Sequence, residues 1–132
     1  MYNETITFYS KTPPNKGILW DYTISHIEEN SICGDDLEVF IKIEDNKVTD
    51  FSFDWETAII TTACASIFWE AIIGLHLDEI LTKDYLFIEQ LVDMEISPRR
   101  RQASVLWLLT VRNAIHKYLQ DGILDDFDDL IL

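Results

Sequence analysis

The chain has two cysteines, and they lie in very different surroundings. Cys33 lies in the stretch Ile32-Cys33-Gly34-Asp35-Asp36. A cysteine thiolate binds soft metals and attacks sulfur, and a glycine beside it favours an exposed turn. The two neighbouring carboxylates raise the pKa of a thiol. Cys33 is therefore a candidate nucleophile or sulfur acceptor, and the two neighbouring carboxylates oppose its reactivity.

The other groups that could bind metal are more simply explained as structural residues. Cys64 lies inside the apolar stretch 58–73, where a small buried side chain is expected. His26, His76 and His116 are far from Cys33 in the sequence, and each is more simply a surface or helix-face residue than a ligand. Because no histidine near Cys33 offers a general base, we expect no enzymatic activity.

A run of three arginines stands out in an acidic chain. Arg99, Arg100 and Arg101 follow Ser97-Pro98, which is typical of a helix start. Cations in a first helical turn oppose the helix dipole, so a binding partner is one explanation for them. The run would contact an acidic partner or the aspartate-rich tail of this chain. A solvated cationic face explains it equally well.

The composition limits the possible partners and compartments. A formal charge of −14 and a pI near 4.3 argue against binding to nucleic acid or to an anionic membrane. Two cysteines form no disulfide framework, so we expect a protein of the reducing cytoplasm. A length of 132 residues with 48% hydrophobic residues predicts one domain over residues 1–120. The acidic-hydrophobic tail, residues 121–132, is either a docking segment or a frayed end.

The elements that must position these residues are visible in the hydrophobic pattern. Apolar residues alternate in 37–44 and 47–55, which predicts an antiparallel hairpin with its turn at Asp45-Asn46. A third strand is expected within 19–28. Helices are expected at residues 2–10, 57–73, 76–81, 84–92 and 98–119. The predicted fold class is α+β, with helices packed on one face of a small three-stranded antiparallel sheet. The four tryptophans are expected to be core or interface anchors.

Several short motifs carry a family resemblance over residues 9–119. They are Pro14-Asn15-Lys16-Gly17, Cys33-Gly34-Asp35, the small residues of the 58–74 helix, Leu77-Asp78-Glu79 and the segment 98–107. In their order and spacing the chain resembles the IscU/SufU/NifU N-terminal family of iron–sulfur cluster assembly scaffolds. The resemblance implies three antiparallel strands with helices and a cluster site at one exposed end. It also implies a ligand set of three cysteines and one aspartate, for a cluster, iron or zinc.

Only part of that ligand set matches. Cys33 and Asp35 correspond to the first cysteine and the aspartate, whereas Ala58 and Gln102 stand where the other two cysteines are expected. One thiolate and one carboxylate do not complete the four protein ligands of a [2Fe–2S] cluster. A homodimer could pool the ligands of two chains.

Two hypotheses follow from the resemblance. In the first, the chain is a scaffold with a depleted site, where Cys33 accepts sulfur from a cysteine desulfurase or binds metal. In the second, it is a non-catalytic binding module that kept the scaffold surface and modulates the desulfurase or a scaffold paralogue.

Overall fold

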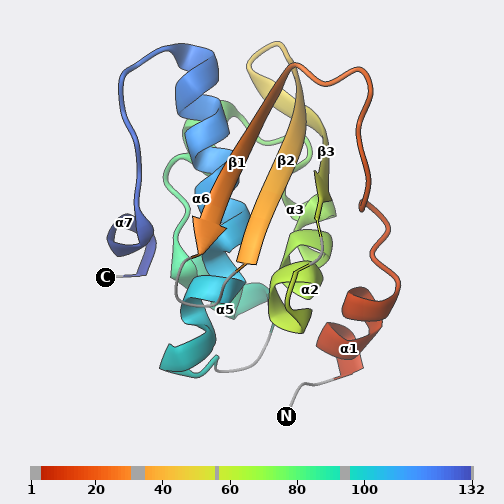
Figure 1. The fold of residues 1–132 in the computed structure, drawn as a ribbon. Helices are drawn as coiled ribbons and strands as arrows, with labels where there is room; N and C mark the ends of the chain where they lie inside the picture. The colour runs from red at the N-terminus through yellow and green to blue at the C-terminus, as the bar shows by residue number, and fades with distance from the viewer. Residues whose placement is uncertain (1–3, 31–34, 56, 93–95, 132) are drawn as a thin grey trace.

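The computed structural model describes residues 4–30, 35–55, 57–92 and 96–131. Along the chain, Figure 1 shows a short helix, three strands and then helices only. The helices are α1 (Glu4–Lys11), α2 (Ile59–Ile67), α3 (Trp69–Ile72), α4 (Leu77–Ile80), α5 (Tyr85–Val92), the 3-10 turn η1 (Pro98–Arg100), α6 (Arg101–Leu119) and α7 (Phe127–Ile131). The strands are β1 (Ile24–Asn30), β2 (Asp35–Glu44) and β3 (Lys47–Asp54).

The three strands form one antiparallel sheet in the order β1-β2-β3. The β2–β3 turn is made by Asp45 and Asn46, whose φ angles of 53° and 59° suit a tight hairpin turn and are tolerated by Asp and Asn. The outer edge of β3 is covered by the segment before Gly17: Phe53 N–H donates to the carbonyl of Asn15 at 3.1 Å, and Gly17 N–H donates to the carbonyl of Phe53 at 2.7 Å. The predicted hairpin is confirmed.

The helices pack behind one face of the sheet, so the predicted α+β class is confirmed (Figure 1). Alternate residues of β2 bury their side chains against these helices; they are Leu37, Val39, Ile41 and Ile43. Trp107 of α6 lies at the centre of the core, stacked on Phe68 with ring centroids 4.9 Å apart. One exception to the alternation is Phe40, which is buried on the other face because Tyr22 covers it with an edge-on ring contact at 5.4 Å.

Two predicted elements differ from the structure. The first strand begins at Ile24, because residues 19–23 form a connection that crosses the outer face of the sheet. The helix predicted over 57–73 is divided at Phe68 into α2 and α3. The backbone there has φ −85° and ψ 0°, and the Phe68 ring is fixed by its contacts with Trp107 and Phe87. Tertiary packing therefore overrides a continuous helical pattern.

The prediction that the tryptophans are core or interface anchors is confirmed for the core at Trp107, and two of the others are exposed. Trp107 is fully buried, and Trp69 is partly buried. Trp20 is 85% exposed in the connection before β1. Trp55 follows the end of β3 with a φ of 95°, which turns its ring out to the surface, where Nε1 lies 3.4 Å from Oε1 of Glu38.

The C-terminal tail packs against α6. Leu130 of α7 is 1% exposed, so the docking interpretation of this segment fits better than a frayed end. In the part of the chain that the structure describes, no helix is both long enough and apolar enough to cross a membrane.

Candidate functional site

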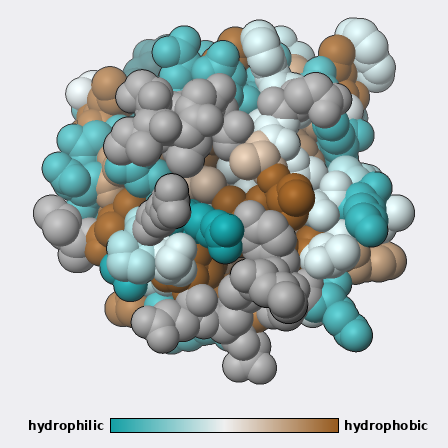
Figure 2. Space-filling model, turned by 60° about the horizontal axis from the view of Figure 1, so that its bottom comes forward, coloured by the Kyte–Doolittle hydropathy of each residue, from teal (hydrophilic) through white to brown (hydrophobic). Residues whose placement is uncertain are grey.

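The described residues next to the predicted ligand positions lie at one end of the sheet. There β1 ends and β2 begins, with Asn30 paired to Asp35. The same end holds the last residues of β3, because Glu38 pairs with Asp54, and the first residues of α2 follow directly. The beginning of α6 also lies at this end (Figure 1). Figure 2 looks at this end, where brown hydrophobic residues reach the surface between teal hydrophilic ones.

The side chains of the two matching ligands are not described, so only the neighbouring residues of the chain can be located. Cys33 lies outside the described residues, and Asp35 is described as the first residue of β2 without its side chain. From Leu37 onward β2 is anchored in the core. Cys33 and Asp35 therefore remain predicted ligands, two residues apart in the sequence, and Asp35 begins the strand that the core anchors.

The other two positions are described, and neither offers a ligand for a soft metal. Ala58 is the N-cap residue of α2, with an exposed methyl group that has no donor atom. Gln102 is the second residue of α6, and its buried Oε1 has no hydrogen-bond partner among the described residues. An amide oxygen suits hard cations, whereas iron–sulfur clusters and structural zinc prefer thiolates.

The donor set therefore does not fit a cluster within one chain. Among the described residues, no group of three or more His, Cys, Asp or Glu side chains is arranged to hold a metal ion. The Oε1 atom of Gln102 has no partner among the described residues, but one such oxygen does not replace two thiolates.

Cys64 is excluded as a replacement ligand by its environment. It is fully buried in the core, and burial raises the pKa of its thiol to about 12. A thiol with that pKa is protonated at neutral pH and reaches neither solvent nor a metal. The prediction that Cys64 is a small buried side chain is confirmed.

The histidines serve other parts of the fold. His76 is the N-cap residue of α4, and its N–H donates to Glu79 at 3.2 Å. His26 pairs with Glu28 at 2.8 Å on β1. His116 is separated from Gln102 by fourteen residues of α6, which is about 21 Å of helix. His116 is buried, so of the two expected placements, on the surface or on a helix face, only the second applies.

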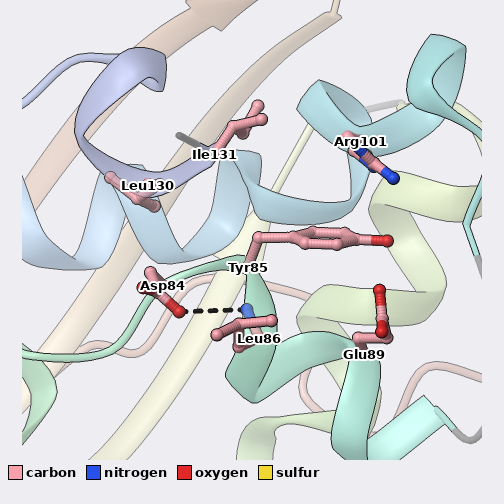
Figure 3. Close-up of a pocket in the computed structure, with 7 residues that line it drawn as sticks. All are labelled: Asp84, Tyr85, Leu86, Glu89, Arg101, Leu130 and Ile131. Atoms are coloured by element: carbon pink, nitrogen blue, oxygen red, sulfur yellow. Dashed lines mark hydrogen bonds between the residues drawn. The ribbon is translucent and has the colours of Figure 1, made fainter.

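Arg101, the last residue of the arginine run, lines a cavity of about 320 Å³ between α5, α6 and α7. Figure 3 shows Arg101 above the ring of Tyr85, with Glu89 near the far end of that ring and Leu130 and Ile131 of the tail nearby. The guanidinium carbon of Arg101 is 4.9 Å from the ring centroid of Tyr85, a cation–π contact. Arg101 thus lines the same cavity as two apolar residues of the tail, Leu130 and Ile131. Arg100 is exposed, and the side chain of Arg99 is not described, so partner binding by the run remains a prediction.

A polar cluster that the sequence patterns did not reveal holds the tail. Oδ2 of Asp125 accepts from Nε of Arg112 and lies against Nε2 of His116, both at 2.9 Å. Asn113 exchanges two hydrogen bonds with the backbone of Asp125, at 3.0 and 2.8 Å. Nδ1 of His116 lies 2.7 Å from Asp121. Arg112 and His116 are four residues apart, which places them on one helix face and is the signal that could have indicated this cluster.

The comparisons with known proteins agree with this architecture. The sequence model of the NifU-like N terminal domain matches residues 1–123. The iron-sulfur cluster assembly scaffold protein IscU of Thermotoga maritima is 35% identical over 82 residues, which are 62% of this chain and 58% of that protein. The zinc-dependent sulfurtransferase SufU of Bacillus subtilis is 30% identical over 95 residues, 72% of this chain and 64% of SufU. The matches thus span less than two thirds of each relative.

A solved structure shows the same fold. The crystal structure of the NifU-like protein (N-terminal) from Brucella abortus aligns with 91% of this chain and 95% of its own, with a TM-score of 0.76 and 19% identity. The family model covers nearly the whole described chain, and the strand and helix order agrees with the resemblance seen in the sequence. The chain therefore belongs to the NifU-like N-terminal domain family.

Proposed function

We propose that this chain acts in iron–sulfur cluster assembly as a scaffold-like protein whose own ligand set is incomplete. The observation that supports the proposal is a preserved family fold in which Ala58 and Gln102 begin α2 and α6, where the resemblance predicts two of the ligand cysteines. The names of the relatives IscU and SufU suggest the process, iron–sulfur cluster assembly. The small number of donor atoms in this chain argues against a complete cluster site. Stable binding of a cluster by one chain is not expected.

Cys33 is the thiol that this function would use. The only other cysteine, Cys64, is buried and protonated, so thiolate chemistry has one place left in the chain. Asp35 lies two residues away and would assist exchange of a bound metal ion as an oxygen ligand. Because Asp35 and Asp36 raise the pKa of a neighbouring thiol, Cys33 would react faster beside a cationic partner surface.

The sulfur donor that the family resemblance suggests is a cysteine desulfurase. The Cys33 thiolate would attack the outer sulfur of the donor persulfide, forming a new S–S bond while the donor S–S bond breaks. The donor cysteine leaves as a thiolate, and Cys33 carries the persulfide. One relative is named a sulfurtransferase, which fits such a transfer, so the expectation of a protein without catalytic activity becomes a proposal that it accepts sulfur and passes it on.

The test is sulfur loading followed by mass spectrometry. The protein is incubated with a cysteine desulfurase and L-cysteine, and the mass of each cysteine peptide is measured. We expect added sulfur on the peptide that contains Cys33, no addition in Cys33→Ser, and normal loading in Cys64→Ala. Loading of Cys64, or equal loading of wild type and Cys33→Ser, would contradict the proposal.

A further inference from the structure

A two-lobed groove lies beside β3, away from the ligand positions. One lobe, of about 250 Å³, is bordered by α1, α2 and α3; the other, of about 210 Å³, is bordered by the connection before β1 and the middle of β3. Pro14 and Trp69 border both lobes. We call this feature the Trp69 groove.

Two residues that line the Trp69 groove have a buried side-chain oxygen without a hydrogen-bond partner in the described part of the chain. Asn15 is 6% exposed; its Nδ2 donates to the carbonyl of Ala65 at 3.1 Å, while its Oδ1 has no partner among the described residues. Ser66, 2% exposed, lines the other lobe, and its Oγ also lacks one. Both oxygens are shielded from solvent, and the amide oxygen of Asn15, which can only accept a hydrogen bond, adds to the negative electrostatic character of its lobe.

The charged and aromatic residues of the Trp69 groove also favour a cationic ligand. Asp50 lines one lobe and Glu70 the other, while Trp69 lies between them and donates from Nε1 to Asp50 at 3.2 Å. Phe8, which is 60% exposed, adds an aromatic wall. Lys16 also lines the groove and opposes a cation, but the two carboxylates outnumber it, and the whole chain carries a charge of −14.

We propose that the Trp69 groove binds an arginine side chain from a basic, apolar segment of a partner protein. A guanidinium group has five N–H donors and no acceptor, which suits the carboxylates of Asp50 and Glu70. It also stacks on aromatic rings such as Trp69 and Phe8, which an ammonium group does less well. Apolar residues beside the arginine would cover Phe8 and Ile67, which line the same lobe. The proposal does not depend on sulfur or metal chemistry at Cys33.

The test is a titration followed by NMR through the indole N–H signal of Trp69. The probe is a short peptide that alternates arginine and leucine, and the matched peptide carries citrulline, which keeps the shape and lacks the charge. We expect a saturable shift of the Trp69 signal with the arginine peptide. Binding of the citrulline peptide should be weaker by about tenfold, the loss of one charge-assisted contact.

Two variants locate the binding site. Glu70→Gln removes a carboxylate from the groove, whereas Glu29→Gln removes an exposed carboxylate on β1 and changes the net charge equally. We expect Glu70→Gln to weaken the arginine peptide several-fold and Glu29→Gln to leave it unchanged. Equal effects of the two variants would show nonspecific attraction and overturn the proposal. An unchanged Trp69 signal at saturating peptide, or equal binding of the arginine and citrulline peptides, would overturn it too.

Discussion

We expect the side chain of Asp125 to hold the C-terminal tail against α6, so its removal should lower the free energy of unfolding. Its carboxylate, 9% exposed, meets Arg112 and His116, whose side chains are 11% and 7% exposed. Hydrogen bonds to charged groups contribute about 1.5–3 kcal/mol each, and breaking a buried ion pair costs about 3–5 kcal/mol. Without Asp125, Arg112 keeps a second hydrogen bond, from Nη1 to the carbonyl of Lys83 at 2.8 Å. We therefore expect the loss of stability to lie near the lower end of that range.

We therefore expect Asp125→Ala to lower the free energy of unfolding by about 3 kcal/mol. Undocking of the tail is the alternative response, and it exposes Leu130, whose burial is worth about 2 kcal/mol. Both responses lower the melting temperature by about 10 °C in a chain of this size. Undocking would also increase hydrogen exchange in residues 121–131, so the two responses can be told apart.

The assays are urea unfolding and hydrogen exchange followed by mass spectrometry. Asp125→Asn keeps the shape and removes the charge, so it should lose a large part of the same stability. Asp128→Ala is the matched control, because Asp128 is an exposed aspartate of α7, and its change should stay within about 0.5 kcal/mol. Unfolding of Asp125→Ala at the wild-type urea concentration, with unchanged hydrogen exchange in the tail, would refute this prediction.

Three further predictions concern single side chains. Two interactions hold the pKa of Asp121 below its usual 3.8: first a hydrogen bond from the backbone N–H of Ile123, and second the contact with His116. The Asp121 carboxylate therefore stabilises the fold above pH 3.8, and this stabilisation is lost as the pH falls through the lowered pKa. Carboxyl NMR titration should give an Asp121 midpoint below 3.8, and a midpoint above that value would contradict the geometry. With a pKa of about 12, Cys64 has about one thiolate in 10⁴ at pH 8, so folded Cys33→Ser should resist thiol reagents until urea unfolds it. Nε1 of Trp107 is buried without a partner among the described residues, so Trp107→Phe should cost only lost packing, about 1–3 kcal/mol, against about 3–5 kcal/mol for Trp107→Ala in urea unfolding.

The sequence predicted the elements that are determined by local pattern. The β2–β3 hairpin follows from strict alternation and from two turn residues that tolerate positive φ. The end of the apolar helical stretch at Gly74, where φ is 89°, follows from glycine chemistry in the same way. The division of that stretch at Phe68 could not be predicted, because it depends on Trp107, which is thirty-nine residues later in the chain.

The position of the candidate site stays a prediction, because Cys33 lies outside the described residues. The family resemblance, rather than a local pattern, indicated Ala58 and Gln102, and the structure has these two residues at the beginnings of α2 and α6. The unpaired oxygen of Gln102 follows from tertiary packing, which no local pattern encodes. The same holds for the tail: alternating Asp and apolar residues left docking and fraying equally open, and the contacts of Asp125 with α6 decide between them.

The most direct test of the account is metal binding with the missing ligands restored. Wild type, Cys33→Ser and the double variant Ala58→Cys/Gln102→Cys are reconstituted anaerobically with iron and sulfide, or with zinc, and metal content and visible absorption are measured. We expect no stable cluster in wild type and about one metal site per chain in the double variant, because it would hold three thiolates beside Asp35. A stoichiometric cluster in wild type that disappears in Cys33→Ser would contradict the account and indicate a complete site, with ligands pooled between two chains.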